Sequence, residues 1–211
     1  MRRHGFTLFE LLLVIGLMGL ATTLGGAILL EVMEAWDRVS VRTGLDAMAQ
    51  TVFDRLDTDF GDMLSSDLTG VSLVVISRSL EDGNQPAGQV LPDDMLIVPV
   101  CTSTDPAGAV SGTTVMYQIE RENGRDLLVQ TTGDLQTDIP IGGRVELIPR
   151  ADVLSMRVEY ADKNGVWLEA NGEEGWFKGL PRAVRISLTL ADLDRPDEQI
   201  SRSKVFPIHV D

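Results

Sequence analysis

An apolar run near the N-terminus limits what this chain can fold into. Residues 11–30 are uncharged without interruption, and Leu, Ile, Val and Met predominate among them. A helix of about 20 residues extends roughly 30 Å, which is the thickness of the hydrocarbon core of a bilayer. The run therefore predicts a transmembrane helix, which we place at residues 6–30.

The charges that flank this run predict its orientation. Arg2 and Arg3 precede it, whereas Glu31 follows it. Because basic residues are retained on the cytoplasmic side, we expect the N-terminus in the cytoplasm and everything after residue 31 outside. A cleaved secretory signal has a shorter apolar stretch, of about 7–15 residues. An ordinary signal anchor leaves the carboxylate of Glu10 unexplained, and the unequal flanking charges argue against a buried core helix.

Glu10 stands at the start of the apolar run, where a carboxylate is costly to bury. It belongs to residues 5–15, GFTLFELLLVI, a stretch that resembles the N-terminal methylation motif of the type IV pilin-like family. The resemblance implies that a prepilin peptidase removes the leader, residues 1–5, by cutting between Gly5 and Phe6. It also implies N-methylation of the new Phe6 amine. Phe9 departs from the isoleucine that is usual at that place.

The same resemblance implies a partner for Glu10. Cleavage would expose a positive amine on Phe6 close to the depth of the carboxylate. Opposite charges attract strongly in a medium of low dielectric constant, and either charge left alone is costly. In the family, this carboxylate pairs with the amine of a neighbouring subunit in a filament. Because positions four apart share a helix face, pairing within one chain before assembly is an alternative.

The helix is expected to continue beyond the apolar run. No proline occurs before Pro86, and apolar residues recur near the helical period. We predict an amphipathic helix over residues 31–66 that packs one side on a globular domain. The predicted apolar positions are Val32, Trp36, Val39, Leu45, Met48, Val52, Leu56, Phe60, Met63 and Leu64. The opposite face is predicted to hold Glu34, Asp37, Arg38, Arg42, Asp46, Asp54, Arg55, Asp57, Asp59 and Asp62. A free coiled coil is less favoured because the spacing is nearer 3.6 than 3.5 residues per turn.

The remaining residues, 67–211, indicate a β-rich globular domain. Asn123-Gly124 and Asn164-Gly165 are typical hairpin turns, and no helical pattern alternates with the strands. We therefore predict an α+β fold, with one long helix packed on an antiparallel sheet or pair of sheets. The β-prone runs are residues 71–76, 95–98, 114–119, 127–131, 145–148, 154–160, 183–190 and 204–210. Further turn signals lie at residues 82–84, 106–108 and 142–143.

A second resemblance covers part of this domain. Residues 156–160, the tryptophans Trp167 and Trp176, and residues 180–186 (LPRAVRI) are similar to the C-terminal half of the minor pseudopilin J family of type II secretion systems. That family implies a structural subunit at the tip of a periplasmic pseudopilus. Its expected partners are other minor and major pseudopilins, the prepilin peptidase, an inner-membrane assembly platform and the lipid bilayer. A minor pilin of a type IV pilus, serving adhesion, motility or DNA uptake, is the alternative.

Charge narrows the choice of partners. The chain has a formal charge of −14, and loss of Arg2 and Arg3 would leave 16 basic against 32 acidic residues, near −16. Such a surface repels nucleic acid, so we expect no nucleic-acid partner.

Few residues are suited to catalysis. The two histidines are His4, in the expected leader, and His209, near the end; Cys101 is the single cysteine and is interpreted as a buried apolar residue. No serine elbow, Walker loop or dinucleotide motif occurs. We expect no enzyme, no catalytic residue, no cofactor and no metal, although an anchored enzyme is a second alternative. The acidic residues at 192–198 lack the spacing of a calcium loop and are interpreted as a solvated turn.

Overall fold

The computed structural model describes most of the chain in several segments. Its contacts form two compact units, Met1–Thr43 and Gly44–Asp211. The expected cleavage site and the turn signals at 82–84 and 106–108 lie outside the described residues, as does Trp176. The described residues are 7–63, 74–78, 93–104, 110–134, 142–162, 164–169 and 181–208.

The apolar run forms the first part of a single helix, α1 (Leu8–Gly61). An 18-residue window of this helix has a mean hydropathy of 2.1, and none of the window is buried. The helix is therefore long and apolar enough to cross a membrane. Its threonines add no unsatisfied polar groups, because the hydroxyls of Thr22 and Thr23 donate to the carbonyls of Met18 and Leu20 at 2.8 and 2.9 Å.

In the second unit, one face of α1 lies in the core. This confirms the predicted amphipathic packing from Leu45 onward, whereas Val32, Trp36 and Val39 are exposed and Leu64 lies outside the described residues. The predicted place of Asp59 was also wrong: it belongs to the buried face and not to the charged one. The buried residues of α1 are Leu45, Ala49, Val52, Phe53, Leu56, Asp59 and Phe60, which recur at the helical period.

The helix also ends earlier than predicted, at Gly61 rather than at residue 66. After Gly61 the chain turns and joins the sheet. The N–H of Cys101 donates to the carbonyl of Asp62 at 2.8 Å, and Met63 forms an isolated antiparallel bridge with Val100. The backbone groups that bond to a strand are not available to continue the helix, and here residues 62–63 pair with residues 100–101 instead of extending the helix.

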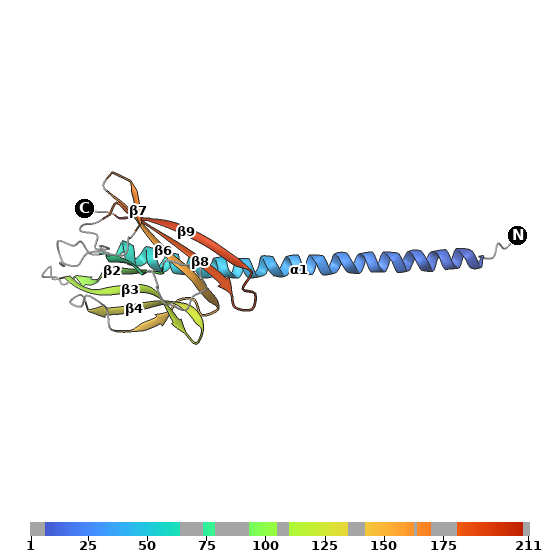
Figure 1. The fold of residues 1–211 in the computed structure, drawn as a ribbon, viewed down its shortest axis with the longest axis horizontal. Helices are drawn as coiled ribbons and strands as arrows, with labels where there is room; N and C mark the ends of the chain where they lie inside the picture. The colour runs from blue at the N-terminus through green and yellow to red at the C-terminus, as the bar shows by residue number, and fades with distance from the viewer. Residues whose placement is uncertain are drawn as a thin grey trace. The chain divides into compact units, whose positions relative to one another are not determined.

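Nine strands occur among the described residues (Figure 1). Seven of them form the order β5-β4-β3-β2-β6-β8-β9, while β1 pairs with β2 and β7 pairs with β6. Every strand pairing is antiparallel except a single parallel contact between β2 and β6, at Asp93 and Met156. The bounds are β1 (Val74–Arg78), β2 (Asp93–Thr104), β3 (Val110–Glu122), β4 (Arg125–Asp134), β5 (Arg144–Glu146), β6 (Ala151–Ala161), β7 (Trp167–Glu169), β8 (Ala183–Asp192) and β9 (Gln199–Pro207).

The sheet thus consists of two antiparallel blocks, β1 to β5 and β6 to β9, joined by the single ladder pair of β2 and β6. Helix α1 contacts both blocks. Phe60 stacks on Phe206 of β9 with ring centroids 5.0 Å apart, and Asp59 bonds to side chains of β3 and β4. The predicted α+β architecture, a helix on antiparallel sheets, is confirmed.

Both predicted hairpin turns are present. Asn123 and Gly124 have φ of 53° and 78° and join β3 to β4 through the pair Glu122 and Arg125, as expected for a type I′ turn. The loop from β6 to β7 is longer. There the Asp162 carboxylate accepts the N–H groups of Asn164 and Val166, both at 2.8 Å. Among the hydrogen bonds that lower the pKa of the Asp162 carboxyl group, the one from the Val166 N–H has the largest effect.

Gly124→Ala is expected to lower the free energy of unfolding by about 1–2 kcal/mol, because a Cβ is strained at this positive φ. Gly44→Ala is the matched control. Gly44 is an exposed helical residue with open space around its Cα, so alanine should stabilise by roughly 0.5–1 kcal/mol. Urea unfolding of the full chain in detergent micelles measures both. A stabilising Gly124→Ala would contradict the turn geometry.

Helix α1 is also held to β9 by charge. Arg202 Nε lies 2.5 Å from the Asp46 carboxylate, and Lys204 Nζ lies 3.2 Å from that of Asp57. These four side chains are partly exposed, so each pair adds little to stability. Because Arg202 and Lys204 are charged residues of β9, which ends the strand order, they also disfavour pairing of β9 with a foreign strand.

Candidate functional site

Glu10, the one predicted site residue within the described segments, is part of a capping box. Its carboxylate accepts the backbone N–H of Thr7 at 3.0 Å and the Thr7 hydroxyl at 3.1 Å. In return, the Glu10 N–H lies 3.3 Å from the Thr7 hydroxyl oxygen. This reciprocal pattern satisfies two N–H groups that the first turn of a helix otherwise leaves unpaired.

The capping box adds a local role to Glu10 that the sequence interpretation missed. The signal was present, since Thr7 and Glu10 have the Thr-x-x-Glu spacing directly before an apolar run. Gly5 and Phe6 lie outside the described residues, so the pairing of Glu10 with the Phe6 amine stays a prediction. What the structure does bring together is a helix start at Leu8 and a carboxylate held in its first turn.

A second group of polar side chains lies in the core of the globular unit. Tyr117 of β3 donates a short hydrogen bond to the carboxylate of Asp59. Gln130 of β4, the cross-strand partner of Tyr117, donates to Asp59 at 3.1 Å and to the Tyr117 hydroxyl at 3.0 Å. The three side chains are 0–5 % exposed. They form a closed ring that joins the last turns of α1 to β3 and β4.

Burial dominates the electrostatics of this ring. Loss of hydration raises the pKa of Asp59, whereas the bonds from Tyr117 and Gln130 and the nearby Arg55 oppose the rise. Burial raises the pKa of Tyr117 as well, and the Asp59 carboxylate adds to it. The tyrosine therefore stays a hydrogen-bond donor, and Asp59 is the member of the ring that can change charge.

Tyr117→Phe is expected to destabilise the globular unit by about 1.5–3 kcal/mol near neutral pH, the usual range for a hydrogen bond to a charged group. The ring closes around the buried carboxylate, so the loss should be smaller in an Asp59→Asn background. Urea unfolding of the four proteins of this double-mutant cycle measures the coupling. An equal loss in both backgrounds would mean that Tyr117 acts independently of Asp59.

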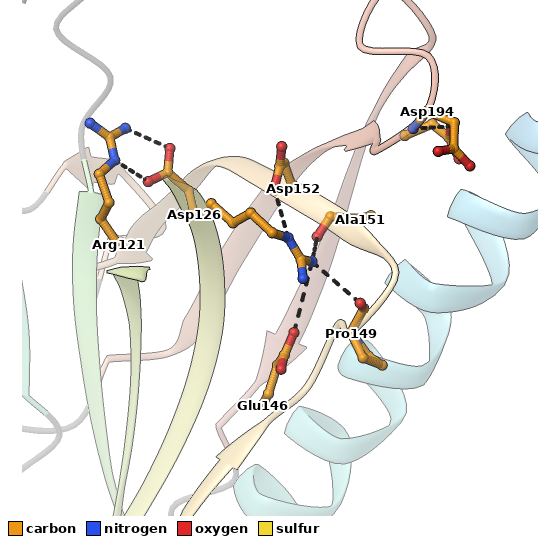
Figure 2. A network of polar contacts seen from close by, with 9 residues as sticks. Arg121, Asp126, Glu146, Pro149, Ala151, Asp152 and Asp194 are labelled. Atoms are coloured by element: carbon orange, nitrogen blue, oxygen red, sulfur yellow. Dashed lines mark hydrogen bonds and ion pairs between the residues drawn. The ribbon is translucent and has the colours of Figure 1, made fainter. Parts of the chain in front are cut away.

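A network of charges holds the connection from β5 to β6 (Figure 2). One Nη of Arg125 lies 3.3 Å from the carbonyl of Pro149 and 3.4 Å from that of Ala151. The guanidinium also lies within 3.9 Å of the Glu146 carboxylate and 3.5 Å of that of Asp152. Arg125 thereby contacts the carbonyl of Pro149 in the turn and that of Ala151 at the start of β6, which is a structural task.

His4 and His209 lie outside the described residues, and the other sequence candidates within those residues form no reaction centre. Cys101 is partly exposed, so its interpretation as a buried residue was wrong. In the acidic turn from β8 to β9, the Asp192 carboxylate accepts the N–H group of Asp194 (Figure 2) and that of Arg195, both at 3.0 Å. Among the residues that the structure describes, no group of three or more His, Cys, Asp or Glu side chains is placed to hold a metal ion.

Two cavities border α1 in the globular unit. The larger, of about 340 Å³, lies at the end of the helix and is lined by Asp57, Phe60, Gly61, Met63, Phe206, Pro207 and Ile208. The smaller, of about 220 Å³, lies beside β9 and is lined by Asp46, Ala49, Gln50, Phe53, Arg202, Ser203 and Lys204. As the described residues line them, neither contains a histidine or cysteine side chain that would act as a base or nucleophile.

The chain was compared with known proteins. No protein-family model matches it, and no curated protein matches it. The function of the chain must therefore be argued from its own residues.

Proposed function

We propose that this protein is a minor pseudopilin, a structural subunit at the tip of the periplasmic pseudopilus of a type II secretion system. One observation carries the proposal. A single helix, α1, holds both the apolar segment headed by Glu10 and the face that packs on the antiparallel sheets. The motif at residues 5–15 adds the expectation of a prepilin peptidase and of N-methylation at Phe6.

In this proposal the protein crosses the inner membrane once, with a cytoplasmic N-terminus and a periplasmic globular unit. Arg2 and Arg3 support the orientation. Other major and minor pseudopilins and the inner-membrane assembly platform are its partners. The protein is a substrate of the peptidase and has no catalytic role of its own, and its acidic surface makes nucleic acid an unfavourable ligand.

Intact mass spectrometry of the native protein tests the processing step. We expect the chain to begin at Phe6 with one methyl group on its amine. The same protein from cells without the peptidase should begin at Met1. Finding Met1 in normal cells, where sister prepilins are cleaved, would refute the proposal.

Cross-linking and purification of the full chain from membranes tests the assembly. Co-purification with other minor pseudopilins supports the secretion role. Recovery with the subunits of a retractable pilus would instead identify a minor pilin, and recovery of the chain alone would contradict both roles.

A further inference from the structure

The ring of Asp59, Tyr117 and Gln130 contains an ionisable carboxyl group, that of Asp59, in the buried contact between α1 and strands β3 and β4. The Asp59 side chain is 4 % exposed and lies one turn after Leu56 and two turns after Val52, which are 1 % exposed each. A buried ionised carboxylate must be balanced by hydrogen bonds and nearby charge, whereas a neutral carboxyl group needs hydrogen bonds alone.

The groups that face Asp59 come from three elements among the described residues. On α1 itself, Arg55 Nε lies 3.7 Å from Oδ1, and Asp62 adds a like charge nearby. Tyr117 from β3 and the uncharged Gln130 from β4 both bond to Oδ2. Arg55 is 51 % exposed, so water screens its attraction. No fully buried cation balances the carboxylate among these groups.

We propose that this ring is a proton-operated latch: uptake of one proton by Asp59 tightens the docking of the last turns of α1 on β3 and β4. The protonated side chain keeps an oxygen for Tyr117 and Gln130 and no longer buries a charge. The ionised side chain keeps the same contacts but adds the desolvation penalty, which loosens the turn. This latch belongs to the globular unit and does not depend on the proposed role in secretion.

The direction of the effect follows from the sign of the shift. Burial raises the pKa of Asp59 in the folded state above its value in the unfolded chain. The stabilisation from protonation is therefore complete when the pH is below the pKa of Asp59 in the unfolded chain. It is lost as the pH rises through the pKa of Asp59 in the folded protein. Because Phe60 and Gly61 line the larger cavity, loosening this turn also frees one wall of that cavity.

Hydrogen exchange of the full chain in detergent micelles, over a series of pH values, tests the latch. After correction for intrinsic rates, the opening constant of peptides covering residues 53–61 should rise with pH. A single linked proton limits the rise to about tenfold per pH unit. Peptides from β8 serve as an internal reference. In Asp59→Asn the opening constant should be independent of pH and close to the low-pH value of the wild type.

Asp54→Asn is the matched control, because it removes the same charge from an exposed position of the same helix; it should follow the wild type. Equal pH dependence in the wild type and Asp59→Asn, or a wild-type turn that tightens as the pH rises, would overturn the proposal. Tyr117→Phe gives an independent test if Asp59→Asn fails to fold. Without the Tyr117 hydroxyl donor, the rise of the opening constant should occur at a higher pH than in the wild type. A rise at the same pH as in the wild type would also overturn the latch.

Discussion

Glu10→Leu is expected to leave membrane insertion and cleavage after Gly5 intact but to exclude the chain from filaments. The substitution makes the helix more apolar, so insertion is not impaired. In the proposed filament, however, the Phe6 amine of a neighbouring subunit would then be buried without its carboxylate. Removing one partner of a buried ion pair costs about 3–5 kcal/mol in proteins. Incorporation should therefore fall by about a hundredfold or more.

Two further variants separate the charge of Glu10 from its capping role. Glu10→Gln keeps a side chain that can complete the capping box with Thr7 but removes the charge, so it should also be excluded. Thr7→Val removes the capping hydroxyl and keeps the charge, so it should assemble. Quantitative co-isolation of each variant with wild-type filaments is the measurement. Normal incorporation of Glu10→Gln would show that the ion pair is not what admits a subunit.

The sequence predicted the parts of the fold that depend on local pattern. The β-prone run at residues 183–190 predicted a strand, and β8 forms there with Val184, Ile186, Leu188 and Leu190 fully buried. Asn123-Gly124 predicted a hairpin because its turn requires positive φ. In both cases the residues that determine the local structure lie within the segment that adopts it.

Asp59 shows where such reasoning failed. It lies three residues after Leu56 and seven after Val52, so its position on the helix already indicated the buried face. It was placed on the charged face because of its residue type. Its partners, Tyr117 and Gln130, are 58 and 71 residues away in the chain, and no local pattern shows that they will meet it. A buried polar ring is thus a property of the tertiary fold.

The strands outside the local pattern were missed or misplaced for similar reasons. Strand β7 has three residues and forms through its pairing with β6. A register shift between Val153 and Ser155 changes which residues of β6 face the core, and a bulge of this kind depends on the neighbouring strand.

Gly142 was predicted as a turn residue, and the structure shows a different reason for a glycine there: no space is left for a Cβ atom. A Cβ there would lie 1.9 Å from the carbonyl oxygen of Thr132.

Phe206→Ala is expected to cause the largest loss of stability in the globular unit, about 3–5 kcal/mol. Phe206 is 1 % exposed, and its ring lies 5.0 Å from that of Phe60 and 6.3 Å from that of Phe53. Its removal would leave a void between α1 and β9 that two helical rings cannot fill without breaking their own packing. It would also remove the ring that faces the Lys204 ammonium at 5.3 Å.

Val205→Ala is the control on the same strand. Val205 is 45 % exposed, so its truncation should change stability by no more than about 0.5 kcal/mol. Phe206→Leu restores most of the volume and should cost less than the alanine variant, because a hydrophobic side chain of similar size still fills the site. Urea unfolding of the full chain in detergent micelles ranks the three. If Phe206→Ala unfolded like Val205→Ala, the aromatic contact could not be what holds α1 to β9, and the two ion pairs at Arg202 and Lys204 would have to carry that docking.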